Sequence, residues 1–280
     1  MGTTQRIIPG VTGQPNWRQL NNSITNLAKT VEQEKESELE DENLNNIVSE
    51  EKSEQDSKDY LNLIKRRKNH LRSAFRNLIK TGGGAALISK GGSPSIGRAG
   101  LKSAGKIANI FVSVGIIGLE QTLKNLNFSD LDGKTFQSVI DFLLIFCSES
   151  NSGMDETAAN KASCEVMNLV VDQSGNDLDS FEKYIKTAVE GSGLANLLCN
   201  FWGFYIFEHL SQRFQEKITQ TKGEQISVET FNIIREDILG QVKLLNETRA
   251  VSKIDWQGEE GLKTIESIFE SIIRIISDEN

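Results

Sequence analysis

The stretch Leu194–Ile218, LANLLCNFWGFYIFEHLSQRFQEKI, decides the fold of this chain. It runs for 25 residues without proline, which is far longer than an ordinary strand. Its aromatic run Phe201–Phe207 would point to all sides of a helix. A helix that is apolar all round is a buried helix, so the run predicts a central core helix rather than a stacking surface for a ligand.

The segments on either side of this stretch also have helical periodicity. Apolar residues recur at spacings of three and four, and alternation with a period of two is nearly absent. Pro94 is the last proline of the chain. The sequence therefore predicts an all-α fold, an irregular helical bundle. We expect helices within Leu101–Leu126, Thr135–Cys147, Glu156–Val171, Leu178–Val189, Ser227–Leu245, with Ser227 as its cap, and Gly261–Ile276.

The first 59 residues have a different character. No regular element fits Met1–Pro15, and Trp17–Val31 has the spacing of a short amphipathic helix that we expect to order on a partner. Glu32–Asp59 is rich in Glu, Ser, Asn and Gln, with too little apolar surface to offset the entropy cost of ordering. We therefore expect residues 1–59 to be a long flexible N-terminal tail with an acidic linker, and residues 60–280 to be the helical domain.

Charge is arranged in blocks. Residues 32–59 contain 12 acidic and three basic residues, whereas Tyr60–Leu119 contains 11 basic residues and no acidic one, although the net charge of the chain is −8. The basic residues lie in a Gly-rich segment at 65–106. Five of them, Lys65, Lys68, Arg72, Arg76 and Lys80, form a stripe at helical spacing, before the Gly82–Gly84 run that ends the helix.

The stripe predicts a docking surface, and two kinds of partner fit it. It would bind the phosphates of a nucleic acid, or it would bind an acidic protein, including the acidic segment of this chain. Few aromatic residues accompany the charges, which does not favour base stacking. Because the whole chain is negatively charged, we favour an acidic protein partner and keep nucleic acid as the alternative.

No catalytic, metal or cofactor motif is complete, so we expect a protein that is not an enzyme. Gly100–Ile107 resembles a phosphate loop, but Ile107 replaces the Ser or Thr that holds magnesium, and no strand precedes it. Cys199 and His209 share one helix about 15 Å apart, too far for a nucleophile and its base. No Cys/His set has zinc spacing. We expect His209 to be half-buried, and Asp155 to be an acidic residue at a helix start, where the helix dipole favours negative charge.

The three cysteines have no disulfide pattern, which fits a reducing compartment. No signal peptide is visible, and the longest apolar stretch, Ile107–Leu119, is shorter than a membrane span and predicts a buried helix. We expect a cytoplasmic protein that does not contact a membrane.

Gly2 follows the initiator methionine, and its small size predicts that Met1 is removed. The product has a glycine α-amine on an extended leader. An α-amine titrates near pH 7.7–8.0, so about a tenth or more is unprotonated and nucleophilic at neutral pH.

Several stretches together resemble a known family. They are the Met1–Thr3 tip, the leader stretch Gly13–Trp17, and His70–Arg76 leading into the basic Gly-rich segment. This combination is similar to QatB, the B component of the Qat anti-phage defence systems of bacteria. The resemblance implies an operon that also encodes an ATPase, a QueC-like enzyme related to the deazaguanine synthase of queuosine biosynthesis, and a TatD-like nuclease.

The resemblance further implies that the chain has no intrinsic cofactor and is a protein substrate. The QueC-like partner would join a deazaguanine-type nucleobase to the amine of Gly2, with Thr3, Thr4 and Gln5 in its active-site channel. The alternative is a structural adaptor that bridges the ATPase and the nuclease, or holds nucleic acid through the basic segment.

Overall fold

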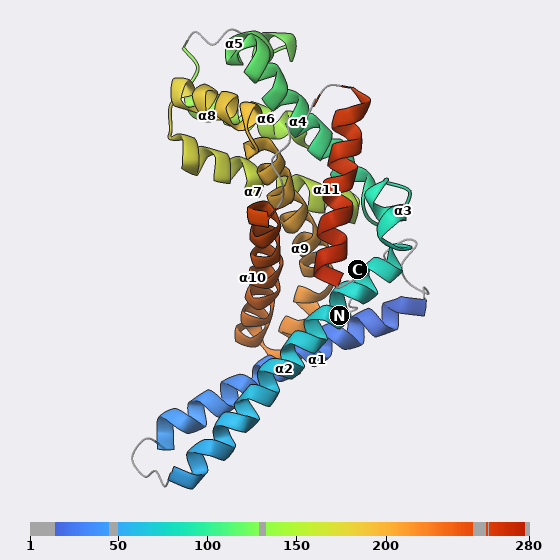
Figure 1. The fold of residues 1–280 in the computed structure, drawn as a ribbon, viewed down its shortest axis with the longest axis vertical. Coiled ribbons are helices and arrows are strands. Elements are labelled where there is room, and N and C mark those ends of the chain that lie inside the picture. The colour runs from blue at the N-terminus through green and yellow to red at the C-terminus, as the bar shows by residue number, and fades with distance from the viewer. Residues whose placement is uncertain (1–14, 45–49, 129–132, 249–255, 257, 278–280) are drawn as a thin grey trace, which may run out of the picture.

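The structure is a computed structural model that describes residues 15–44, 50–128, 133–248, 256 and 258–277, and every regular element in them is a helix (Figure 1). The all-α fold class is thus confirmed. The helices are α1 (Pro15–Leu44), α2 (Glu50–Thr81), α3 (Ala85–Ser89), α4 (Arg98–Ile117), α5 (Leu119–Asn125), α6 (Phe136–Cys147), α7 (Met154–Ser174), α8 (Leu178–Glu190), α9 (Gly193–Lys222), α10 (Glu224–Thr248) and α11 (Glu259–Ser277).

Helix α9 is the centre of the bundle, as its sequence predicts. It packs against α1, α4, α7, α8, α10 and α11. Phe201, Trp202 and Tyr205 have no exposed surface, and their rings contact one another at centroid distances of 5.0–6.1 Å. The aromatic run is core, and it does not form a ligand-stacking surface.

Two glycines allow α4 to pack closely on its neighbours, Gly97 on α3 and Gly100 on α9. Gly97 stands before α4 with a φ of 111°, and a Cβ there would lie 2.3 Å from the Ile88 carbonyl oxygen. A Cβ on Gly100 would lie 2.6 Å from the Trp202 ring. The Trp202 ring also stacks on Phe269 of α11, with ring centroids 3.6 Å apart. A larger residue at Gly97 would push α4 away from α3, and one at Gly100 would push it away from α9.

Glycines also account for two differences from the expected helix boundaries. The helix expected over Leu101–Leu126 divides at Gly118, which has a φ of 84°. Gly223, with a φ of 85°, ends α9, and α10 begins at the next residue. Ser227 therefore lies inside α10 rather than at its cap, and its Oγ donates to the Gln215 carbonyl oxygen at 3.2 Å.

Among the described residues, α4 is the one helix long and apolar enough to cross a membrane by length and composition. Half of the 18-residue apolar stretch of α4 is buried inside the protein, where the helix packs against α7, α8 and α9. It matches the buried helix that the apolar stretch predicts.

The α1 and α2 helices form a long antiparallel hairpin that packs along one end of the bundle (Figure 1). Leu20, Ile24, Leu27 and Val31 of α1 are buried. Their packing is supplemented by polar contacts: Ser23 Oγ lies 3.0 Å from Ser73 Oγ and accepts a hydrogen bond from Asn77 at 3.2 Å.

The structure differs from the expected flexible tail over residues 15–44, because helix α1 starts at Pro15 and packs against α2. The amphipathic stripe of Trp17–Val31 does form a helix, but its partner is α2 of the same chain. Trp17 also stacks on Phe214 of α9 with ring centroids 5.4 Å apart. The sequence alone could not show that the apolar face of α2 lies opposite this stripe.

Replacing Ile24 with alanine tests this correction. Because Ile24 is fully buried, the truncation should lower the free energy of unfolding by about 2–5 kcal/mol in urea denaturation followed by circular dichroism. Lys29→Ala, on the exposed side of the same helix, should change it by less than about 0.5 kcal/mol. Equal and small effects of the two substitutions would show that residues 17–31 belong to a flexible tail and do not pack on the bundle.

Candidate functional site

The predicted docking stripe lies on one exposed side of α2. Lys65, Lys68, Arg72, Arg76 and Lys80 are all exposed, and we call them the basic face. The buried side of the helix carries Leu71, Phe75 and Leu78, which face the core. Lys65 and Lys80 are 15 residue steps apart, so the basic face is about 22 Å long along the helix axis.

Four of the five cations of the basic face lack the ion pairs that cations form elsewhere in the described structure. Cations of α4, α7 and α9 form ion pairs, such as Lys106 with Glu149 at 3.0 Å. In contrast, Lys65, Lys68, Arg76 and Lys80 have no ion pair with any described carboxylate. No acidic residue occurs from Tyr60 to Leu119, so pairing with the next turn toward the C-terminus is impossible.

Two acidic side chains of α1 bind cations that lie outside the basic face. Glu34 is buried and binds Arg67, with Arg67 Nη1 2.6 Å from Glu34 Oε2. Glu32 binds Lys222 of α9 at 2.5 Å. These two ion pairs tie α1 to α2 and to α9.

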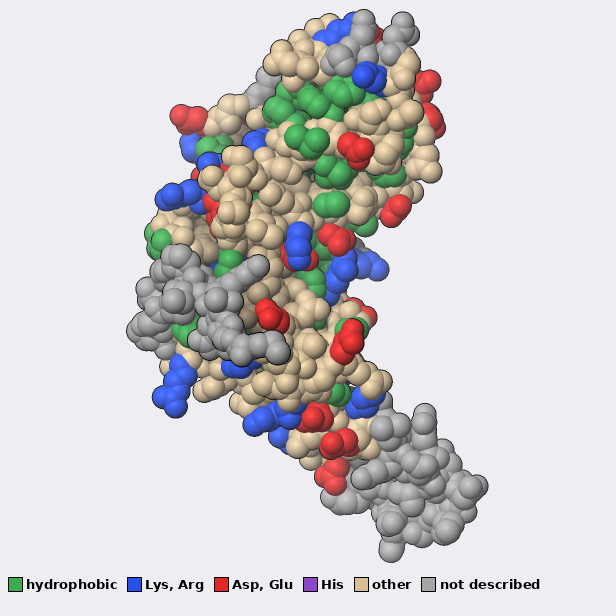
Figure 2. Space-filling model, turned by 180° about the vertical axis from the view of Figure 1, so that it is seen from behind, with side chains coloured by type: hydrophobic (Ala, Val, Ile, Leu, Met, Phe, Trp, Pro, Cys, Tyr) green, Lys and Arg blue, Asp and Glu red, His purple; other side chains and the backbone are tan. Residues whose placement is uncertain are grey.

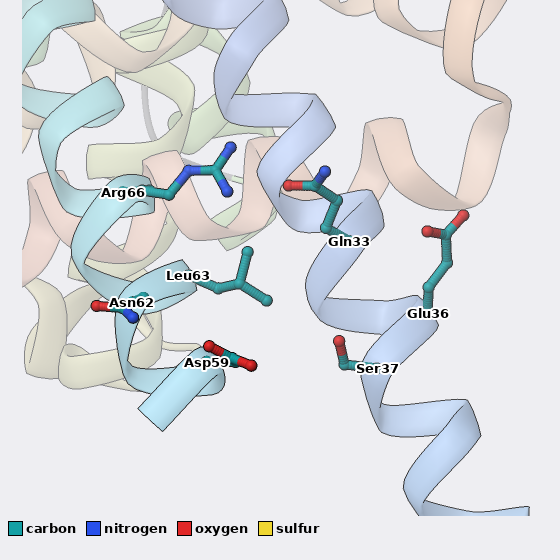
Figure 3. A pocket seen from close by; sticks show the side chains of 7 residues that line it. All are labelled: Gln33, Glu36, Ser37, Asp59, Asn62, Leu63 and Arg66. Atoms are coloured by element: carbon teal, nitrogen blue, oxygen red, sulfur yellow. The ribbon is translucent and has the colours of Figure 1, made fainter. Parts of the chain in front are cut away.

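An open pocket lies between the two helices of the hairpin (Figure 3). It is lined by Gln33, Glu36, Ser37, Asp59, Asn62, Leu63 and Arg66. Acidic, basic and amide groups are mixed on its walls, and it contains neither histidine nor cysteine. Across the described residues, no group of three or more His, Cys, Asp or Glu side chains could hold a metal ion.

A second polar cluster is buried where α4, α7 and α9 meet. Asp155, in the first turn of α7, accepts hydrogen bonds from the backbone N–H of Ala99 at 2.8 Å and of Gly97 at 3.2 Å. It also accepts from the Tyr205 hydroxyl and from His209 Nε2, the latter at 3.1 Å. One carboxylate thus caps the start of α4 and ties it to the central helix.

The protonation states follow from burial and from these contacts. Burial by itself would raise the pKa of Asp155, but the hydrogen bonds, that from His209 foremost, hold it well below its usual range. Burial lowers the pKa of His209 to about 4, helped by the neighbouring Arg213 charge. A neutral ring that donates from Nε2 keeps Nδ1 unprotonated. This agrees with Nδ1 having no hydrogen-bond partner among the described residues.

Arg213 completes the cluster by donating from Nη2 to the Ser95 carbonyl oxygen at 3.3 Å. Burial lowers its pKa to about 10, which leaves it charged at neutral pH. Its charge balances that of Asp155 beneath the loop that leads into α4. The cluster has the geometry of an anchor that fixes three helices.

Sequence reasoning missed this cluster. It described His209 as half-buried, whereas the ring has no exposed surface. Asp155 does lie at a helix start, but its hydrogen bonds go to a different helix. A usable signal was present, because Tyr205, His209 and Arg213 recur every four residues and form a polar line along an otherwise apolar helix.

Two further stretches were singled out in the sequence, residues 2–5 and residues 100–107. Gly2, Thr3, Thr4 and Gln5 lie outside the described residues. The phosphate-loop-like stretch 100–107 lies within α4 and forms no loop. Its Lys102 and Lys106 both bind Glu149, at 3.7 and 3.0 Å.

The buried His209 predicts a pH dependence of stability. Its folded-state pKa, near 4, is below the ordinary value of 6.5, so the unfolded chain binds more protons between these limits. Stability of the wild type should therefore fall as the pH drops from 6.5 to 4, by up to roughly 3 kcal/mol relative to His209→Gln. The measurement is urea denaturation of both proteins at a series of pH values.

Above pH 7 the stability difference between wild type and His209→Gln should be constant, because histidine is then neutral in both the folded and the unfolded state. Stability curves that stay parallel down to pH 4 would show that His209 is not a buried neutral group.

Comparison with known proteins places this helical body in a family. Residues 95–276, well over half of the chain, match the family model described as Qat anti-phage system associated protein QatB. The match begins at the loop that Arg213 binds and contains Asp155, Tyr205 and His209. No curated protein and no solved structure matches the chain. The described helices and this match together show that the chain belongs to the QatB family of Qat anti-phage system associated proteins.

Proposed function

We propose that this QatB-family protein is the protein substrate of the QueC-like enzyme of its operon, which joins a deazaguanine-type nucleobase to the amine of Gly2. Membership of the family makes the chain a component of an anti-phage defence system. The observation that carries the proposal is the leader: Gly2 is separated by a short stretch of chain from a helical body that begins at Pro15.

The chemistry requires only a free amine from this chain. The enzyme would activate a carboxylated deazaguanine with ATP as an acyl adenylate, releasing pyrophosphate. The unprotonated Gly2 amine would attack the acyl carbon, an amide bond would form, AMP would leave, and the nitrogen would lose one proton. In the ordinary reaction of the synthase, ammonia is the nucleophile. A glycine amine is a reasonable replacement, because no side chain hinders it.

The length of the leader suits this role. Thirteen residue steps separate Gly2 from Pro15, and fully extended they span at most roughly 43–47 Å. That is enough for Thr3, Thr4 and Gln5 to enter an active-site channel while the helical body stays outside. The modification would be made by a cytoplasmic bacterial enzyme on this chain, which itself contributes no catalytic residue and no intrinsic cofactor.

A second function is favoured by the distribution of surface properties. Hydrophobic side chains gather over the upper half of the molecule seen from behind, where α4 to α8 lie (Figure 2). Exposed hydrophobic residues of α4 and α6 include Ile116, Ile117 and Ile145. The basic face of α2 is at the other end of the bundle. Two separate surfaces of different chemistry would suit an adaptor that bridges the defence ATPase and the TatD-like nuclease, or that holds nucleic acid on its basic side.

Replacing Gly2 with proline tests the substrate role. Proline still permits removal of Met1, but its ring makes the terminal amine secondary and hindered. We expect intact-mass spectrometry to find one added nucleobase-sized group on the wild type expressed with its whole operon, mapped to Gly2, and none on Gly2→Pro.

Gly2→Ala is the matched control. It keeps a primary α-amine after Met1 removal and should still acquire the group, at a reduced rate. A conjugate on the terminus of Gly2→Pro would overturn the mechanism. An unmodified wild type would overturn the substrate role and leave the adaptor.

A further inference from the structure

The basic face lies beside the point where the leader joins the helical body. Ser23 of α1 contacts Ser73 and Asn77 of α2, which fixes the antiparallel register of the hairpin. Moving toward Pro15 on α1 corresponds to moving toward Lys80 on α2. The start of α1 and the end of α2 lie together in Figure 1. The leader therefore begins at the same end of the hairpin as the C-terminal end of the basic face.

The position of this junction is fixed by packing. Trp17, two residues after Pro15, stacks on Phe214 of α9. Leu20, one turn further, is fully buried. Since α9 is the central helix, the leader has a fixed origin relative to the basic face. A partner bound there would find the leader starting next to it.

We propose that the basic face of α2 is the docking surface for an acidic surface of the enzyme that modifies the leader. This inference rests on the proposed substrate role and adds to it the place where the enzyme is held. Docking would raise the effective concentration of the Gly2 amine at the active site, because the second contact becomes intramolecular. The reach of the leader is about twice the 22 Å length of the basic face.

Charge and size favour a protein over a nucleic acid as the occupant. The positive surface is a single helix side about 22 Å long, and α2 carries the negative charge of Asp59 just before it. Across the pocket of the hairpin lies Glu36, on the facing helix α1 (Figure 3). An extended phosphate backbone that continued along the hairpin would meet these carboxylates. A compact acidic patch would cover the cations alone.

The test is the kinetics of conjugation with purified components: the full chain, the QueC-like enzyme, carboxylated deazaguanine and ATP. A variant with Lys65→Glu, Arg76→Glu and Lys80→Glu should raise the KM for the chain by about tenfold or more, because unlike charges become like charges. Its kcat at saturation should stay within about twofold, since Gly2 and the leader are unchanged.

The matched control carries Lys134→Glu, Lys183→Glu and Lys243→Glu. Lys134 is exposed just before α6, Lys183 on α8 and Lys243 on α10. The change in net charge is the same as in the basic-face variant. Its KM should stay within about twofold of the wild type. Thermal unfolding of both variants should match the wild type, which separates lost docking from lost folding.

Each other outcome separates the two ideas. Equal KM values for the basic-face variant and the wild type, with Gly2 modified in both, would overturn the docking surface and keep the substrate role. No modification of the wild type would overturn both. If the basic-face variant instead loses binding of a duplex DNA or RNA oligonucleotide while its KM is unchanged, the face belongs to a nucleic acid and the docking proposal is wrong.

Discussion

The carboxylate of Asp155, largely covered where three helices meet, is the constraint around which the rest of the bundle is arranged. It accepts hydrogen bonds from the first backbone N–H groups of α4 and from Tyr205 and His209 of the central helix. An ionised carboxylate in such a place is stable only because every contact is a donor and because Arg213 lies nearby. Loss of one donor would leave buried charge uncompensated, so the three helices hold a single arrangement.

A series of packing contacts connects this anchor to the basic face of α2. Gly100 lets α4 approach Trp202, and that ring also stacks on Phe269 of α11. Helix α11 in turn packs against α2 and α3. The hairpin is thus held from the bundle side by α11 and from the α1 side by Trp17 on Phe214. The basic face and the origin of the leader are fixed relative to one another by the same core.

Much of this structure follows from periodicity in the sequence. The central helix, its aromatic core and the exposed stripe on α2 each follow from the spacing of residues within a single helix. The start of the body at Pro15 and the Asp155 cluster depend on which helix lies opposite which. The apolar stripe of α1 needed an apolar partner on α2. Asp155 needed hydrogen-bond donors on other helices, from Gly97 and Ala99 on one side of it in the sequence to Tyr205 and His209 on the other. Such long-range pairing leaves no trace in spacing, apart from the polar line through His209 on α9.

The central claim is that a helical body starting at Pro15 holds the leader beside a docking face on α2. Hydrogen–deuterium exchange of the full chain, alone and with the QueC-like enzyme, tests it most directly. The account predicts that residues 17–31 of the free chain are protected about as strongly as α9, and that the enzyme adds protection at residues 65–80. Rapid exchange of residues 17–31 in the free chain, or added protection confined to other helices, would contradict it.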